Sequence, residues 1–231
     1  MSIVFITGGN KGLGHETARR LIGLGHKVYI GCRDAERGEK AAEELGAGLV
    51  RVDVTSDESV TNAAKELSAM EEYIDVLINN AGVSGRLMKP ENMTADEMLR
   101  VYNTNVFGMV RVINAFIPLL RRSENPVIVN VASGLGSFGT VTDPSKMESR
   151  VNSIAYCSSK SAVAMLTLQY AKGLPDIKVN CADPGATATD LNGFRGKQTV
   201  QEGTDAIVKL AAIGKDGPTG VYINREGIIP W

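Results

Sequence analysis

Tyr156 and Lys160 stand four residues apart in the segment Ala155-Tyr156-Cys157-Ser158-Ser159-Lys160. Four residues are about one helical turn, so both side chains would lie on one face of a helix. An ammonium group there can stabilise a neighbouring phenolate and lower the pKa of the tyrosine, which suits proton donation during carbonyl reduction. By itself the pair is weak evidence, because the same spacing is common on ordinary solvated helices.

A glycine-rich segment near the amino end strengthens this interpretation. Thr7-Gly8-Gly9-Asn10-Lys11-Gly12-Leu13-Gly14 follows an apolar, strand-like run and precedes apolar residues at helical spacing. Such a turn lets the backbone reverse tightly and brings a pyrophosphate to the amino terminus of the helix. Elsewhere it would be only a turn, but in this position it favours dinucleotide binding, with contacts expected from Gly8, Asn10, Lys11, Gly12, Leu13 and Gly14.

Apolar strand-like runs alternate with amphipathic segments along the whole chain. Strands are expected at 3–6, 28–30, 49–52, 76–78, 127–131, 177–182 and 221–223, and helices at 13–22, 35–45, 56–70, 94–120, 156–171 and 200–212. Strands apolar on both faces call for a parallel sheet covered on each side. The pattern predicts an α/β fold: one doubly wound Rossmann-type domain over 1–231, with a mostly parallel sheet of about seven strands flanked by helices and ligands at its carboxyl edge.

Composition argues against several classes of partner. The net charge of -1 offers no electrostatic footprint for nucleic acid or an anionic membrane. The longest apolar stretches are strand-sized and no signal-peptide pattern opens the chain, so a cytoplasmic protein is expected. Cys32, Cys157 and Cys181 fit neither a disulfide framework nor zinc-ligand spacing, and His15 and His26 lie outside any ligand cluster. We expect reduced thiols and no metal.

Six motifs occur in an order and spacing that resemble the short-chain dehydrogenase/reductase family over essentially the whole chain. They are the glycine turn, Asn79-Asn80-Ala81-Gly82, Asn105, Ser133, the Tyr156 and Lys160 pair, and Pro184-Gly185 with Thr189. The stretches 7–12 and 32–38 further resemble the carbonyl-reductase-like branch.

The resemblance implies a catalytic role for four residues. Tyr156 would donate a proton to the substrate carbonyl oxygen, and Ser133 would hydrogen-bond that oxygen. Lys160 would hold the nicotinamide ribose and lower the tyrosine pKa, while Asn105 would hold a water that connects Lys160 to solvent. Ser133 and Asn105 also have plain structural readings, as the start of a loop and as a satisfied polar residue in a helix.

The choice of cofactor depends on the end of the second strand. Arg33 favours NADP(H), because a guanidinium group can pair with the 2′-phosphate, and Lys11 could add a second cation. Asp34 is expected to cap the next helix. By resemblance, further cofactor contacts are expected from Asp53, Val54, Asn80, Ala81, Gly82, Pro184, Gly185, Thr187 and Thr189, although Thr187 stands where the family usually has valine or isoleucine.

A short lid is expected over 186–198, with Gly193 and Gly196 leaving it mobile. Leu191 and Phe194 would face Leu135, Phe138 and Met147 across an open apolar pocket, or would merely pack the loop. The expected substrate-binding residues are Ser133, Leu135, Tyr156, Leu191 and Phe194. The resemblance also implies a homodimer or homotetramer, paired through the helices at 94–120 and 156–171.

Together these observations predict an NADPH-dependent oxidoreductase that transfers a hydride to a ketone, aldehyde or quinone carbonyl of a small molecule. The alternative is a non-catalytic NADP(H)-binding sensor or regulatory protein, which would have no physical need of Ser133, Tyr156 and Lys160 together. A nucleotide-sugar epimerase would need a larger region after Pro184.

Overall fold

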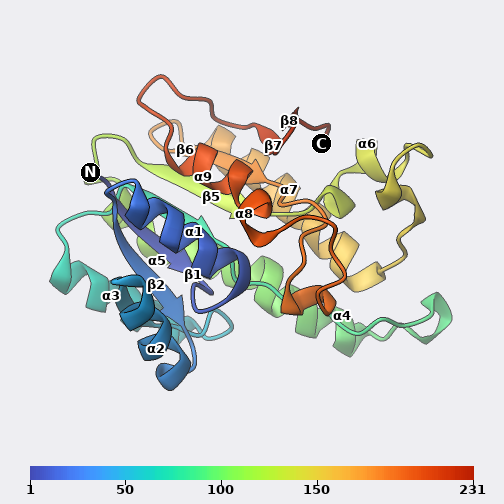
Figure 1. The fold of residues 1–231 in the computed structure, drawn as a ribbon, viewed down its shortest axis with the longest axis horizontal. Coiled ribbons are helices and arrows are strands. Elements are labelled where there is room, and N and C mark those ends of the chain that lie inside the picture. The colour runs from blue at the N-terminus through green and yellow to red at the C-terminus, as the bar shows by residue number, and fades with distance from the viewer.

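Eight strands form one sheet in the order β3-β2-β1-β4-β5-β6-β7-β8 in the computed structural model, which describes residues 1–231 (Figure 1). The strands are β1 (Ile3–Thr7), β2 (Lys27–Cys32), β3 (Gly48–Arg51), β4 (Val76–Asn79), β5 (Val127–Val131), β6 (Lys178–Ala182), β7 (Tyr222–Asn224) and β8 (Gly227–Ile228). The first seven are parallel, which confirms the predicted doubly wound α/β fold. The eighth strand was not expected. It spans only two residues and turns back antiparallel on β7, too short to leave an apolar pattern.

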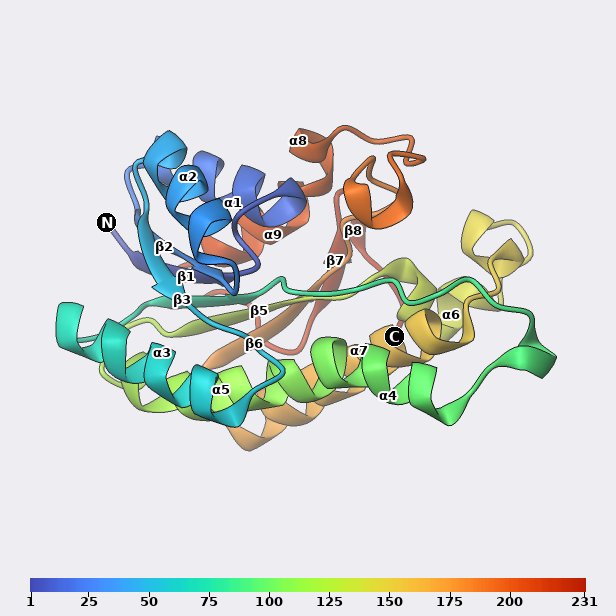
Figure 2. The same ribbon diagram turned by 90° about the horizontal axis from the view of Figure 1, so that it is seen from below.

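Helices cover both faces of the sheet (Figure 2). One face carries α1 (Gly12–Gly23), α2 (Ala35–Leu45) and α9 (Asp205–Ala211), with the short α8 (Val200–Gly203) beside them. The other face carries α3 (Asp57–Met70), α4 (Ala95–Tyr102), α5 (Gly108–Leu120) and α7 (Ile154–Gly173), and the one-turn α6 (Phe138–Val141) lies near the end of α7.

Two hydrophobic cores, one on each face, account for this layering. Every residue of β1, β4 and β5 is buried, because alternate side chains enter opposite cores. On the α3, α5 and α7 face the rings of Phe5 and Phe116 stack with centroids 4.7 Å apart. Burying an aromatic ring of this size contributes roughly 1.5–3 kcal/mol relative to exposure.

Helix starts follow the expected capping residues. The side chain of Asp34 accepts a hydrogen bond from the Arg37 amide at 3.1 Å, which confirms the expected cap of α2. The Ser56 side chain caps α3 by accepting a hydrogen bond from the Ser59 amide at 3.2 Å.

Two helices that were expected to be continuous are interrupted. The segment 94–120 contains a π turn (Asn103–Phe107) between α4 and α5, and the segment 200–212 breaks at Thr204 between α8 and α9. A π turn is a local widening of a helix and leaves little trace in apolar periodicity.

No helix combines the length and apolar character needed to cross a bilayer.

The strand order reverses between β1 and β4, and this opens a crevice at the carboxyl edge of the sheet. Thr7, the last residue of β1, ties the two strand ends together. Its hydroxyl accepts hydrogen bonds from the amides of Asn80 and Ala81, both at 3.1 Å.

Candidate active site

One large cavity of about 620 Å³ follows the carboxyl edge of the sheet. Residues at the ends of β1 to β6 line it, together with the start of α7. The lining includes most of the residues that sequence reasoning selected: Gly8, Asn10, Lys11, Gly12, Leu13, Arg33, Asp53, Val54, Asn80, Ala81, Gly82, Ser133, Leu135, Tyr156, Lys160, Pro184, Gly185, Thr187, Thr189 and Leu191. Gly14, Asn105 and Phe194 lie outside this cavity.

The glycine turn between β1 and α1 has the geometry of an anion cradle. Gly8 and Gly12 have φ of 66° and 56°, which favours glycine. Gly14 supports the turn from behind, since a Cβ there would stand 2.4 Å from the Gly8 carbonyl oxygen. No side chain caps the start of α1 and its first turn contains no acidic residue. The first amides of α1 therefore suit a pyrophosphate.

The end of the cavity beside β2 holds a cluster of charged residues. Arg33 and Arg37 both line the cavity, and Arg37 also forms an ion pair with Asp34. Lys11 reaches across the mouth and pairs with Asp190 in the segment expected to form the lid. Lys11 thus lines the cavity as expected, with its ammonium paired to a carboxylate.

Asp53 forms a tight turn at the end of β3. Its carboxylate accepts hydrogen bonds from the Thr55 amide at 2.9 Å and the Thr55 hydroxyl at 2.7 Å. Burial acts to raise the pKa of Asp53, but the Thr55 hydrogen bonds and the charges of Arg33 and Arg111 hold it below its usual value. One carboxylate oxygen of Asp53 is therefore occupied in holding this turn at the edge of the cavity.

Tyr156 and Lys160 lie one turn apart on α7, as expected. The Lys160 Nζ is 5.7 Å from the centre of the Tyr156 ring and donates a hydrogen bond to the Val131 carbonyl oxygen at 2.7 Å. Burial raises the pKa of Tyr156 to about 12, opposed by a hydrogen bond with the Ser133 hydroxyl. Burial also lowers the pKa of Lys160 to about 8. The expected depression of the tyrosine pKa is therefore absent from this structure, since desolvation dominates and the ammonium turns to a backbone carbonyl.

Asn105 occupies the centre of the π turn and is fully engaged with the protein. Its side-chain oxygen accepts from the Val83 amide at 2.8 Å, and its amide donates to the Val83 carbonyl at 2.9 Å and to the Ser159 hydroxyl at 3.0 Å. These bonds tie the loop after β4 to α7. The widened turn places Asn105 between the loop after β4 and α7, the helix that carries Lys160.

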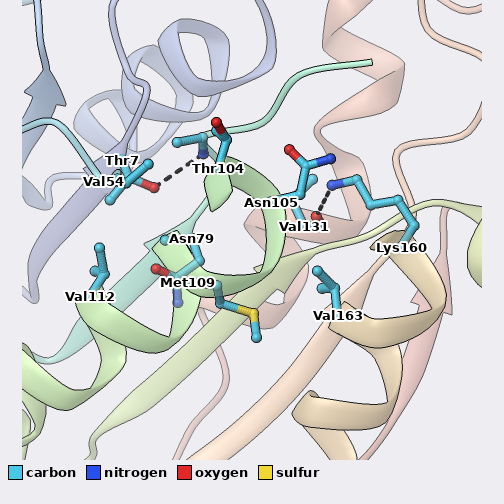
Figure 3. A pocket seen from close by; sticks show the side chains of 12 residues that line it. Thr7, Val54, Asn79, Thr104, Asn105, Met109, Val112, Val131, Lys160 and Val163 are labelled. Carbon is cyan, nitrogen blue, oxygen red and sulfur yellow. Dashed lines mark hydrogen bonds between the residues drawn. The ribbon is translucent and has the colours of Figure 1, made fainter. Parts of the chain in front are cut away.

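A second, very small cavity lies beneath Lys160 (Figure 3). Its volume is about 10 Å³, the space of one water molecule, and Lys160, Asn105, Asn79 and Thr104 are among its lining residues. The side-chain oxygen of Asn79 is buried and has no hydrogen-bond partner in the protein. A partly polar cavity of this size therefore adjoins the lysine, and Lys160, Thr104 and Val131 line both cavities.

Two carboxylates at the substrate end escaped the sequence reasoning. Asp183 is 5% exposed, and its carboxylate accepts a hydrogen bond from the Gly185 amide at 2.8 Å. Burial raises the pKa of Asp183, and the charge of Glu148 adds to the rise. A Cβ on Gly134 would stand 3.1 Å from Asp183 and 3.5 Å from Glu148, so both groups converge on the loop that follows β5. The one local signal was an aspartate directly before Pro184-Gly185.

The segment 186–198 forms one side of the cavity mouth. Leu191 faces the cavity, with Leu135 and Met147 on the opposite wall. Phe194 does not contribute: it has φ of 60°, is 71% exposed and lies outside the lining. Gly193 and Phe194 are successive left-handed residues, so the chain reverses and the ring points to solvent.

Two further expectations, one about Phe138 and one about Gly196, are corrected. Phe138 is 69% exposed and does not line the cavity. Gly196 packs tightly, since a Cβ there would stand 2.1 Å from the Thr187 carbonyl carbon. The small residue at 196 therefore serves close backbone approach, which argues against the expected freedom of movement.

The comparisons with known proteins agree with this geometry. The family model described as short chain dehydrogenase matches residues 2–199. The short-chain dehydrogenase anuI of Penicillium roqueforti (strain FM164) is 36% identical over 225 residues, covering 92% of this chain and 89% of the relative. Salutaridine reductase of Papaver bracteatum is 27% identical over 291 residues, covering 96% of this chain and 94% of the relative.

Solved structures show the same fold. Salutaridine reductase from Papaver somniferum superposes with a TM-score of 0.84 at 26% identity, covering 96% of this chain and 99% of that one. The 3-ketoacyl-(acyl-carrier-protein) reductase from Brucella melitensis complexed with NADH superposes with a TM-score of 0.85 at 25% identity, covering 96% of each chain. The sequence motifs, the sheet and these matches together show that the chain belongs to the short-chain dehydrogenase family of NAD(P)-binding oxidoreductases.

Proposed function

We propose that this protein is an NADPH-dependent reductase that acts on the carbonyl group of a ketone, aldehyde or quinone, with Tyr156 as the proton donor. One observation carries the proposal: a single cavity of about 620 Å³ joins Arg33 at one end to Ser133, Tyr156 and Lys160 at the other. A nicotinamide dinucleotide and a carbonyl group would therefore meet beside the half-buried tyrosine.

The chain's own residues would carry the proton and stabilise charge, while a bound nicotinamide cofactor supplies the hydride. Because its pKa is about 12, the Tyr156 phenol stays protonated at neutral pH and can donate to the carbonyl oxygen. The Ser133 hydroxyl would donate a second hydrogen bond to the same oxygen, where negative charge develops. Lys160 would bind the cofactor ribose, and the small polar cavity beside it would hold water that replaces the spent proton.

Arg33 supports the choice of NADPH. Its guanidinium group faces the cavity at the end of β2, where a 2′-phosphate would form charge-assisted hydrogen bonds. Lys11 contributes less in this arrangement, because Asp190 already pairs with its ammonium. We propose that the ion pair of Lys11 and Asp190 holds the glycine turn to the segment 186–198.

The substrate end supports a hydrophobic carbonyl compound of neutral or positive charge. Leu135, Met147 and Leu191 form apolar walls, and Glu148 and Asp183 would repel an anionic substrate. Apolar contacts separate close analogues by only about 1–3 kcal/mol, so several bulky carbonyls should be accepted.

We retain the predicted homodimer or homotetramer and the predicted cytoplasmic location as proposals. Exposed apolar side chains support association: Leu99 on α4, Phe107 in the π turn and Met165 on α7 are 59%, 44% and 56% exposed. Light scattering at micromolar concentration should give at least twice the chain mass of 24.6 kDa. A monomeric mass under these conditions would overturn the assembly.

The deciding experiment follows NADPH oxidation with cyclohexanone, benzaldehyde and phenanthrenequinone in turn. We expect turnover with at least one of them, and loss of that turnover in Tyr156→Phe. NADPH binding without turnover of any compound would instead favour the sensor or regulatory alternative.

A further inference from the structure

The backbone of Ser133 is held by a tyrosine far along the chain. The Tyr222 hydroxyl donates a hydrogen bond to the Ser133 carbonyl oxygen at 2.5 Å and accepts one from the Ser133 amide at 3.2 Å. Tyr222 has no exposed surface. Both polar backbone groups of a proposed catalytic serine are therefore bound by one side-chain oxygen.

These two hydrogen bonds, here called the Tyr222 clamp, lie just beyond the end of the backbone pairing between β5 and β6. The last ladder bond beside the serine joins the Ala132 amide to the Ala182 carbonyl at 2.8 Å. The Asp183 amide, on the other side of β6, bonds to the Ile223 carbonyl of β7, and no backbone hydrogen bond joins Ser133 to a neighbouring strand. Ser133 thus has no strand partner, and the tyrosine side chain takes that place.

Tyr222 itself is rigidly held. It pairs with Cys181 in the register of β6 and β7, and its ring packs against Trp231 with centroids 5.4 Å apart and planes tilted by 43°. Burial raises the pKa of the Tyr222 hydroxyl well above its ordinary value, so the group remains a donor at any working pH. The ring cannot move without breaking these contacts.

We propose that Tyr222 is a positioning residue for Ser133, fixing the serine backbone so that its hydroxyl points at the reacting carbonyl oxygen. The inference rests on the proposed reductase function. Within its own loop Ser133 is held by two hydrogen bonds, from the Leu135 amide to its hydroxyl at 3.3 Å and from the Gly136 amide to its carbonyl at 2.7 Å, and neither binds the Ser133 amide. Small displacements of such a donor are costly: a misplacement of about 1 Å can lower the rate by about a hundredfold.

The test compares Tyr222→Phe with Tyr29→Phe. Both remove one hydroxyl from a tyrosine, but the Tyr29 hydroxyl binds Glu71, away from the site. With whichever of cyclohexanone, benzaldehyde and phenanthrenequinone the wild type reduces fastest, Tyr222→Phe should lower kcat by roughly tenfold to a hundredfold. The KM for NADPH should stay within twofold, and Tyr29→Phe should leave kcat unchanged. An unchanged kcat in Tyr222→Phe would overturn the proposal.

A double-mutant cycle separates positioning from general destabilisation. In a Ser133→Ala background, Tyr222→Phe should lower kcat by less than twofold, because the donor that it positions is already missing. Equal losses in both backgrounds would mean that the tyrosine acts only on stability, and the proposal would fail. If Tyr222→Phe does not fold, Trp231→Leu keeps the hydroxyl and loosens only its packing, and the same cycle applies.

Hydrogen exchange distinguishes failure of this inference from failure of the proposed function. The Ser133 amide is bonded only through Tyr222, so a peptide spanning it should exchange at least tenfold faster in Tyr222→Phe than in Tyr29→Phe. This readout needs no turnover. Faster exchange in a protein without reductase activity would retain the clamp and discard the function, whereas unchanged exchange would discard the clamp.

Discussion

Replacing Lys160 by methionine should remove turnover with little loss of stability. Lys160 is 5% exposed, and burial lowers its pKa from 10.5 to about 8. That difference corresponds to roughly 3 kcal/mol of unfavourable free energy for keeping the ammonium buried at neutral pH. Methionine is an unbranched side chain one heavy atom shorter than lysine, and it carries no charge. The Val131 carbonyl loses its donor, which costs about 1–3 kcal/mol, so the two effects nearly cancel at pH 7.

The difference in unfolding free energy between the wild type and Lys160→Met should depend on pH, and this dependence is the more specific test. Between about pH 8 and 10.5 the unfolded chain retains the Lys160 proton while the folded chain has lost it, so the contribution of this group to stability rises with pH. From pH 7 to 9.5 the wild type should gain about 2 kcal/mol relative to Lys160→Met. Below pH 7 both states are protonated and the difference should be constant.

The assay is urea unfolding of both proteins at pH 7, 8.5 and 9.5. Burial raises the pKa of Cys157 and Cys181, so over this pH range they lose protons mainly in the unfolded chain, where the effect is the same in both proteins. Lys172→Met, on the exposed side of the same helix, is the control and should show the wild-type pH dependence. If the stability difference for Lys160→Met were the same at all three pH values, the lysine would not be a buried base with a lowered pKa, and the reasoning would be refuted.

Three other substitutions test the site. Tyr156→Phe should lower kcat by about 10²–10⁴ with unchanged NADPH affinity by fluorescence titration, and near-normal kcat would exclude it as the acid. Arg33→Ala should reduce the kcat/KM preference for NADPH over NADH by roughly tenfold to a hundredfold, whereas an unaltered ratio would remove Arg33 from the phosphate site. Gly14→Ala places a Cβ 2.4 Å from the Gly8 carbonyl oxygen and should cost about 1–3 kcal/mol in thermal unfolding. Gly23→Ala, with open space around it, should be neutral or stabilising, and similar melting of the two variants would contradict the packing argument.

Much of the fold and part of the site could be derived from local patterns. Val127–Val131 is apolar at every position but one, and it is buried on both faces of a parallel sheet. The glycine turn adopts positive φ at Gly8 and Gly12 because few other residues can. Asp34 caps its helix through a contact only three residues away. Each of these features depends on neighbours in the chain.

Other features depend on residues distant in the chain, and the sequence alone did not show them. The direction of the Lys160 ammonium depends on the Val131 carbonyl, and the Tyr156 pKa on how deeply the ring is buried. Phe194 was expected in the pocket, but two successive left-handed residues turn it outward.

Sequence by itself determined the type and order of the main helices and strands, the edge of the sheet that carries the site and the spacing of Tyr156 and Lys160, because the helical and strand periods are properties of the backbone. Only the tertiary structure decided that Tyr222 clamps Ser133 and that Asp183 and Glu148 converge on Gly134. Such contacts depend on where packing brings β7 and the loops after β5 and β6, and no periodic pattern encodes the meeting of side chains so far apart in the chain.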